Sequence, residues 1–170
     1  MRKALLVIDM QNVCVGEEHA NFFQYDNQSL IESVNQAIRE NSDNTIIYIK
    51  NIMKKNLINY FAPFQAYAGS KEVEFINELE IKSDFVFEKY VADSFSNPKL
   101  HEFLLSRQID TIEVIGVDGG GCVAMTAIHA IKNGYRVIVN EKAIGTTPGL
   151  KRKKLKYDKK LKKLGAEFIY

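Results

Sequence analysis

The stretch from Ile112 to Ala127, IEVIGVDGGGCVAMTA, limits what this chain can fold into more than any other part of the sequence. Its first six residues, Ile112–Val117, form a short apolar run that is typical of a buried strand. Three glycines then follow Asp118, and an alanine-rich helical pattern begins with Cys122 in its first turn. The sequence therefore predicts a strand, a tight turn and a helix whose N-terminus carries a thiol.

The position of Cys122 favours chemical reactivity. Unpaired backbone N–H groups and the positive end of the helix dipole stabilise a thiolate over a thiol, and the same N–H groups can receive an oxyanion. The alternative is that Cys122 is a small buried apolar residue and that the glycines only make a turn. Three consecutive glycines before the thiol favour the first interpretation, because they allow another group to approach the backbone closely.

The rest of the chain alternates between short β-branched runs and helical patterns. Strands are expected at Lys3–Ile8, Thr45–Ile49, Phe85–Glu88, Ile112–Val117, Tyr135–Val139 and Ala166–Ile169, and helices at Asn27–Asn41, Glu72–Leu79, Pro98–Arg107, Cys122–Asn133 and over the basic segment Lys151–Lys163. Such alternation predicts an α/β protein in which a parallel sheet is covered on both faces, since parallel strands need helical crossovers. We expect a three-layer, doubly wound, Rossmann-like sheet of six strands in the order 3-2-1-4-5-6, formed by a single domain over residues 1–170.

This strand order brings two candidate residues together. Strands 1 and 4 are neighbours at the point where the order reverses, so that Asp9, after the first strand, and Cys122 should face one crevice. A carboxylate beside a thiol is a base and nucleophile pair in outline. Gln11 follows the same strand, and we expect it to contact substrate. Lys89, at the end of the third strand, would have to reach in from about 10 Å away by strand spacing, so that the pattern alone leaves it as a surface lysine.

Aromatic residues gather in two loops that should border the same crevice. Phe22 precedes the first long helix, and Tyr60 and Phe64 lie in the irregular segment between residues 50 and 69. We predict that these three side chains, together with Phe95, line a substrate pocket. Packing within the core or contacts between subunits would explain the same pattern equally well.

The composition indicates a protein of reducing compartments. Of the 170 residues, 46% are hydrophobic and 26% are charged, as in an ordinary globular domain, and only Cys14 and Cys122 carry thiols. The apolar N-terminal run stops at Asp9, short of a signal peptide, and no stretch reaches membrane-spanning length. A cytoplasmic location is therefore expected.

The net charge of +2 hides an asymmetry. The segment Lys151–Lys163 holds nine basic residues and one acidic residue, a charge of +8. Such a segment is typical of a surface that binds nucleic acid or a membrane, or of the solvated face of a helix that packs on the core. The second is favoured because no aromatic or arginine cluster accompanies the lysines, so that neither nucleic acid nor membrane is expected as a partner. Leu150, Leu155, Leu161 and Leu164 are expected to form a narrow apolar stripe under the charges.

Three motifs in order, ALLVIDMQN at residues 4–12, FEKYVADSF at 87–95 and IGVDGGGCVAMTAIHA at 115–130, resemble those of the isochorismatase-like cysteine hydrolases, which include nicotinamidases and N-carbamoylsarcosine amidohydrolase. The resemblance covers essentially the whole chain. It implies a catalytic triad in which Cys122 is the nucleophile, Asp9 is the general base or proton shuttle, and Lys89 stabilises the thiolate. It also implies a cis peptide bond between Val117 and Asp118, with the N–H groups of Asp118 and Cys122 forming an oxyanion hole.

The chain departs from this family in two places. Nicotinamidase-like members carry an Asp-x-His metal motif after the second strand, where this sequence has Asn51-Ile52-Met53, so no metal site is expected. The histidines are scattered: His101 and His129 are expected to be structural, and His19 is undecided.

Asp118 is the second departure from the family, because a carboxylate so near the nucleophile would either repel a thiolate or contact a polar substrate.

Together these observations predict a metal-independent hydrolase that cleaves a small amide, carbamoyl or related C–N bond through a thioester. It would need no cofactor, would act on a small-molecule substrate, and would form a homo-oligomer of two or more chains. We expect a depressed pKa for Cys122, because Lys89 and the helix N-terminus favour the anion. The alternatives are a catalytically silent member that binds a small anion, an interaction protein recruited through the basic helix, and thiol redox chemistry between Cys14 and Cys122.

Overall fold

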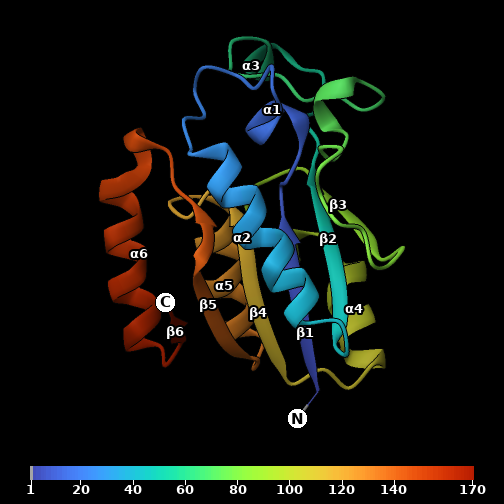
Figure 1. The fold of residues 1–170 in the computed structure, drawn as a ribbon, viewed down its shortest axis with the longest axis vertical. Helices are drawn as coiled ribbons and strands as arrows, with labels where there is room; N and C mark the ends of the chain where they lie inside the picture. The colour runs from blue at the N-terminus through green and yellow to red at the C-terminus, as the bar shows by residue number, and fades with distance from the viewer. Residues whose placement is uncertain (1) are drawn as a thin grey trace.

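The computed structural model describes residues 2–170, with the backbone alone at residue 58. Six strands form one parallel sheet in the order β3-β2-β1-β4-β5-β6 (Figure 1). Their bounds are β1 (Lys3–Ile8), β2 (Thr45–Asn51), β3 (Val86–Lys89), β4 (Thr111–Val117), β5 (Arg136–Gly145) and β6 (Glu167–Ile169). The predicted α/β class and the 3-2-1-4-5-6 order are confirmed.

Alternate side chains of the strands feed two separate cores. Leu5 and Val7 of β1 pack on one face against helix α2 (Asn27–Glu40), whose buried side chains Leu30, Val34, Ala37 and Ile38 recur at helical spacing. Leu6 and Ile8 point to the opposite face, which is covered by helices α4 (Pro98–Ser106), α5 (Cys122–Lys132) and α6 (Lys151–Lys163). The three-layer arrangement follows from this period-2 alternation in a sheet that is buried on both faces.

The prediction of a helix over Glu72–Leu79 is wrong. Only a 3-10 turn, η1 (Lys71–Val73), forms there, followed by an isolated antiparallel bridge between Phe75 and Gln11 and a turn at residues 77–79. The backbone pairs with the residues after β1: Asn12 N–H donates to Glu74 O, and Ile76 N–H donates to Met10 O. Val73, Ile76 and Leu79 are buried, and Leu79 N–H donates to Ile76 O within the turn. Pairing with Met10 and Asn12 replaces the hydrogen bonds that a helix would have made.

Helix α6 also differs from its prediction. The apolar stripe of four leucines does not form, because Leu161 is buried while Leu155 and Leu164 are exposed. The side of the helix that faces the protein consists of Lys154, Tyr157, Asp158 and Leu161. Lys154 bonds Glu141 and Asp158 at 2.8 and 2.7 Å, so that its charge is neutralised where it meets the domain. Leu155 is left among the exposed basic residues.

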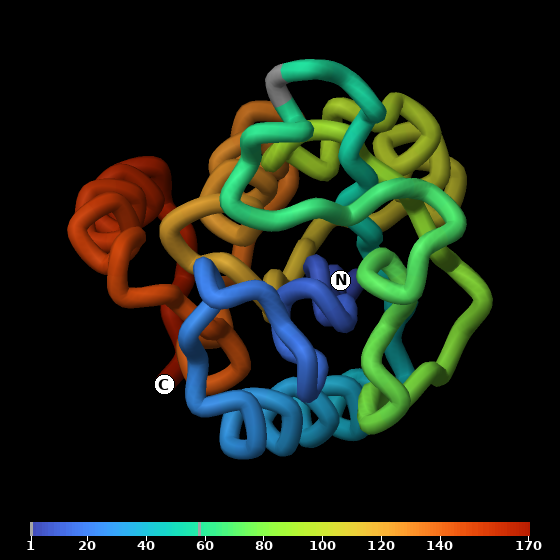
Figure 2. Tube along the Cα trace, turned by 90° about the horizontal axis from the view of Figure 1, so that it is seen from above, coloured from blue at the N-terminus to red at the C-terminus, as the bar shows by residue number. Residues whose placement is uncertain are grey.

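The carboxyl ends of the strands lie at one edge of the sheet, under the connections that carry α1 (Asn12–Val15) and α3 (Leu57–Tyr60) (Figure 1). Seen from above, the chain between β2 and β3 arches over this edge (Figure 2). The remaining 3-10 turns are η2 (Ser94–Ser96) and η3 (Pro148–Leu150). Within residues 2–170, none of the helices combines the length and apolar character needed to cross a bilayer.

Candidate active site

Lys89 lies at the centre of a cluster of polar side chains at the carboxyl edge of the sheet. Its Nζ is 2.8 Å from Oδ2 of Asp9, 3.2 Å from Sγ of Cys122 and 3.3 Å from Oδ1 of Asn51. Asp9 follows β1, Lys89 ends β3, and Cys122 begins α5. Of the three residues implied by the family resemblance, Asp9 and Cys122 therefore both contact the ammonium group of the third, Lys89.

Lys89 reaches the cluster because its side chain passes over the end of the intervening strand. Lys89 pairs with Asn51 in the register of β2 and β3, and Ile52 N–H donates to Lys89 O at 2.8 Å. The Asn51 amide oxygen accepts from the ammonium on its way toward Asp9. Lys89 and Asp9 are 1% and 3% exposed, so that each charge depends on the other for compensation.

The electrostatics of the cluster contradict the prediction of a depressed pKa for Cys122. Burial and the negative charge of Asp9 raise the pKa of the thiol to about 12, and the opposing effect of Lys89 is smaller. Burial also works against the charge on Lys89, but Asp9 and Cys122 outweigh it and raise the pKa of the lysine above its ordinary value. The ligand-free site therefore contains an ammonium and a neutral thiol.

Asp9 has one oxygen available for proton transfer. Oδ2 accepts from Lys89, whereas Oδ1 is buried without a hydrogen-bond partner among the described residues. A buried carboxylate oxygen without a donor is costly, and such atoms are concentrated at functional sites. The free oxygen can accept a proton from the thiol or from a water molecule that enters with substrate.

The turn before Cys122 leaves two backbone donors free. The peptide bond between Val117 and Asp118 is cis, as predicted. Gly121 N–H and Val123 N–H both donate to Asp118 O, whereas the N–H groups of Asp118 and Cys122 have no acceptor in the described part of the chain. An unpaired N–H at the start of a helix is a suitable donor to an oxyanion.

A family model for the Isochorismatase domain matches residues 3–168. The chain belongs to this family. N-carbamoylsarcosine amidase from Arthrobacter sp is 40% identical over 68 residues, which are 39% of this chain and 26% of that relative, so that the match spans about a quarter of the relative's length. The structure of N-carbamoylsarcosine amidase from Thermoplasma acidophilum superimposes with a TM-score of 0.77 at 25% identity, covering 99% of this chain and 95% of that one. Pyrazinamidase of Pyrococcus horikoshii in complex with zinc shares the fold, with a TM-score of 0.85 at 20% identity over 99% of both chains.

The carboxylate of Asp118 is held by three hydrogen-bond donors, none of which comes from Cys122 or Lys89. The carboxylate accepts from Gly120 N–H at 2.6 Å, Thr147 N–H at 2.7 Å and the Tyr25 hydroxyl at 3.1 Å. Burial raises the pKa of this carboxyl, and the hydrogen bonds oppose the rise. Asp118 therefore fastens the nucleophile turn to the chain after β5. Neither Tyr25 nor Thr147 carried a sequence signal for this role.

Gln11 is placed at the site edge, but its amide is occupied. Its Nε2 donates to Asn51 O at 3.1 Å and Val73 O at 2.8 Å, and its Oε1 accepts from Asn51 N–H at 2.8 Å. Both N–H donors and one of the two acceptor directions of this amide are thus used to join the chain after β1 to β2 and η1. The side chain is also fully buried, so Gln11 is a structural residue rather than the substrate contact that we expected.

The predicted aromatic residues do not form one group. Phe22 and Phe64 lie 5.8 Å apart between ring centroids, and both contact Phe23, so that they form a cluster above the α2 core. Tyr60 is 65% exposed on α3, where it contacts Phe61. Phe95 packs with His101 and Tyr135 in the opposite core. Of the four predicted aromatic residues, the structure therefore brings together only Phe22 and Phe64.

The three histidines are occupied by other contacts and do not form a metal site among the described residues. His129 pairs with Asp93, His101 bonds the Tyr135 hydroxyl, and His19 bonds Gly16 O. Among the described residues, no three His, Cys, Asp or Glu side chains converge as metal ligands would. Asn51, identified in the sequence only by its place in that motif, instead contacts Lys89. It is the site residue that sequence reasoning missed, and its signal was its position at the end of the second strand.

Proposed function

We propose that the chain is a metal-independent cysteine hydrolase that cleaves a small amide, carbamoyl or related C–N bond. The observation that carries the proposal is the contact of one buried ammonium, Lys89 Nζ, with both Asp9 Oδ2 and Cys122 Sγ. This arrangement joins a base, a nucleophile and a positive charge beside two free backbone N–H groups. Asp9, Lys89 and Cys122 are the catalytic residues of the proposal.

The first half of the reaction forms a thioester. The Cys122 thiol gives its proton to Asp9 as sulfur attacks the substrate carbonyl, and Lys89 stabilises the developing charge on sulfur. The N–H groups of Asp118 and Cys122 donate to the tetrahedral oxyanion. When the intermediate collapses, the C–N bond breaks and Asp9 returns its proton to the nitrogen, so that ammonia or an amine leaves and Asp9 is again ionised.

The second half consumes water. Asp9 removes a proton from a water molecule that attacks the thioester carbonyl, and the same N–H groups hold the second oxyanion. The C–S bond breaks, Asp9 returns the proton to sulfur, and the acid product leaves. The raised pKa of Cys122 fits this scheme, because the thiol stays protonated until Asp9 accepts its proton in the presence of substrate.

The donor set at residues 51–53 supports metal independence. Asn51 offers one neutral amide oxygen, which already accepts from Lys89 at 3.3 Å, and Met53 offers a thioether that hard cations disfavour. A cation there would also lie near the Lys89 ammonium, which repels it. The residues therefore do not fit the metal of the family's nicotinamidase-like members, and no step of the proposed reaction requires one.

The substrate class rests on the relatives. Two of the similar proteins are N-carbamoylsarcosine amidases, whose names indicate hydrolysis of a carbamoyl group on a small amine. The test is a panel of small amides, carbamoyl amino acids and ureas, with N-carbamoylsarcosine included, assayed for ammonia release by the wild type and Cys122→Ser. Release that requires Cys122 and survives Cys14→Ser supports the proposal, while release unchanged in Cys122→Ser contradicts it. The thiol of Cys14 is the matched control because it is buried in the α2 core, where burial raises its pKa.

A further inference from the structure

The outward face of α6 carries more positive charge than the protein around it neutralises. Arg152, Lys156, Lys159 and Lys163 recur at helical spacing around Leu155, and all five side chains are exposed. Of the nine basic residues of α6, Lys154 alone forms an ion pair within the described part of the chain. Leu155 is 62% exposed in the middle of this face, although it is a good core residue. An apolar side chain ringed by unpaired cations is a candidate docking surface.

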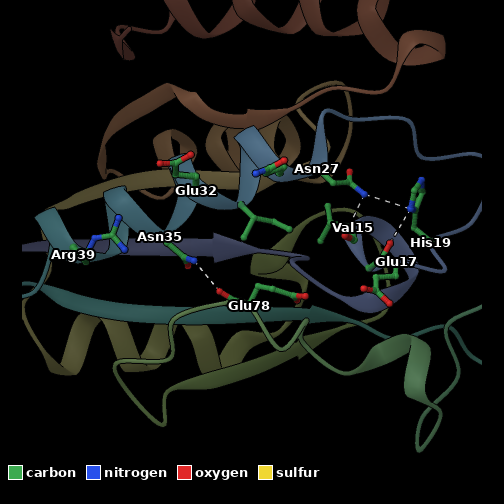
Figure 3. A pocket seen from close by; sticks show the side chains of 11 residues that line it. Val15, Glu17, His19, Asn27, Glu32, Asn35, Arg39 and Glu78 are labelled. Carbon is green, nitrogen blue, oxygen red and sulfur yellow. Dashed lines mark hydrogen bonds between the residues drawn. The ribbon is translucent and has the colours of Figure 1, made fainter.

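An acidic groove lies along α2, on another side of the domain. It has a volume of about 630 Å³ and is bordered by α2, the chain after α1 and the loop that carries Glu78 (Figure 3). Glu17, Glu32 and Glu78 are exposed on its walls, and none of them forms an ion pair with any described residue. The one cation of the groove, Arg39, is paired with Glu80. The groove therefore has an uncompensated negative charge.

The groove also offers apolar and polar contacts. Val15 and Ile31 form part of its lining, and the Oδ1 atom of Asn27 is buried there without a hydrogen-bond partner in the described part of the chain. Asn27 Nδ2 is held by Val15 O and His19, which fixes the free oxygen in place (Figure 3). The half-buried side chain of Ile31, among the carboxylates, matches the exposed Leu155 among the cations, while Val15 is buried beneath the groove. Because exposed ion pairs alone contribute little, the apolar contact is needed for stable docking.

We propose that helix α6 of one copy of this chain docks in the acidic α2 groove of a second copy. Leu155 lies on Ile31, and Arg152, Lys156 and Lys159 face Glu17, Glu32 and Glu78. Arg152 and Lys159 are seven residues apart, about 10 Å along the helix axis, and the groove follows α2 from Asn27 to Arg39, about 18 Å. The helix segment therefore fits within the length of the groove.

The occupant is a second copy because the chain's own helix faces elsewhere. Leu161 and Lys154 fix α6 to the domain, beside β5 and β6, so that its basic face points outward (Figures 1 and 2). The helix and groove are different surfaces, and contact between them is heterologous. Such a contact gives a closed pair or ring of chains if the rotation between successive copies closes, and an open filament if it does not.

Sedimentation of the full chain at several concentrations and salt levels tests the proposal. We expect a species larger than one chain at 50 mM salt that dissociates at least tenfold more readily at 500 mM, since salt screens exposed charges. Two double variants should each be monomeric. One reverses the groove (Glu32→Lys with Glu78→Lys), and the other reverses the helix (Arg152→Glu with Lys159→Glu). Mixing these two variants should restore association, because the reversed helix then meets a reversed groove.

Glu102→Lys and Lys132→Glu are matched controls, since both residues are exposed and lie on α4 and α5, away from both surfaces. Unchanged assembly in these controls, with far-UV circular dichroism equal to wild type in every variant, supports the assignment. A wild type that stays monomeric at 50 mM salt overturns it, as does an oligomer that both reversed pairs leave intact. Binding of the monomer to anionic vesicles or nucleic acid through Arg152 and Lys159, without self-association, would also overturn it.

Discussion

The buried Lys89 ammonium makes Asp9 and Cys122 depend on one another. It is 2.8 Å from the carboxylate and 3.2 Å from the sulfur, and removing either neighbour changes the charge balance that the remaining residues experience. Groups that act in this way as a unit are strongly non-additive when they are substituted.

Cys122→Ala, Asp9→Asn and Lys89→Ala should therefore each lower kcat by about 1,000-fold or more, and the triple variant should be scarcely worse than Cys122→Ala. Steady-state ammonia release on the best substrate of the panel measures this. Wild-type turnover in Lys89→Ala would contradict the role given to the lysine.

The raised pKa of Cys122 predicts how the free thiol reacts. Because burial and Asp9 raise it to about 12, alkylation by iodoacetamide should accelerate about tenfold per pH unit from pH 7 to 10, as the thiolate fraction rises. Asp9→Asn removes the negative neighbour, so the pKa of Cys122 should fall and alkylation at pH 7 should quicken while turnover is lost. Alkylation that is quenched at successive times and measured by mass spectrometry gives the rates. An alkylation rate that stops rising below pH 8 in the wild type would contradict the prediction.

Asn51 and Met53 predict that chelators leave the enzyme active. Activity measured after dialysis against EDTA should equal that of the untreated protein, because neither side chain competes for a divalent ion and Asn51 is held by Lys89. Loss of turnover that zinc or manganese restores would refute metal independence.

Two connections between elements hold the site in shape, and the first is the carboxylate of Asp118. It joins the turn after β4 to Thr147 after β5 and to Tyr25 before α2. Asp118→Ala leaves buried donors unsatisfied, and each of these costs about 1–3 kcal/mol, so the free energy of unfolding should fall by roughly 3 kcal/mol.

The matched variant for Asp118 is Tyr25→Phe, which loses one hydrogen bond and should cost about 1 kcal/mol. Urea denaturation of both variants gives the comparison. Equal stabilities for Asp118→Ala and Tyr25→Phe would show that the bonds to Gly120 and Thr147 contribute nothing.

The second connection is the close approach of β4 to β1 at Gly116. This glycine has φ +104°, and a Cβ there would lie 2.1 Å from Ile8 O, immediately before Asp9. Gly116→Ala should lower the free energy of unfolding by about 3 kcal/mol, from the left-handed backbone and from overpacking. Gly149→Ala is the control, because nothing lies within 4 Å of its added Cβ. Similar melting temperatures for the two variants would contradict this account.

At the scale of the whole molecule, the sheet order determines which distant residues meet. Asp9, Lys89 and Cys122 are separated by 80 and 33 residues, yet they follow or end β1, β3 and β4, whose carboxyl ends share one edge. The alternation of β-branched runs with helical patterns predicted a doubly wound sheet, and the order that we expected is the commonest one for that class. The meeting of Asp9 and Cys122 followed from that order alone, whereas Lys89 came only from the family resemblance.

Other features could not be predicted because non-local contacts override local pattern. The spacing of Val73, Ile76 and Leu79 suited a helix, but this segment instead forms backbone hydrogen bonds with Met10 and Asn12. The leucines of α6 suggested an apolar stripe, but the sheet edge accepts Leu161 and leaves Leu155 exposed. Gln11 resembled a substrate ligand until its amide was seen to hold three backbone groups.

The sequence by itself determined the alternation of strands and helices, and with it the α/β class and the helix that begins at Cys122, because hydrophobic periodicity and glycine placement act over a few residues. Only the tertiary structure decided the partners of the polar side chains: Asp118 with Thr147, Asn51 with Lys89, and one free oxygen on Asp9. It also reversed the predicted shift in the pKa of Cys122, since burial and the nearby carboxylate outweigh the lysine. Hydrogen-bond partners and pKa shifts depend on residues that the sheet brings together from distant parts of the sequence, so local sequence patterns do not predict them.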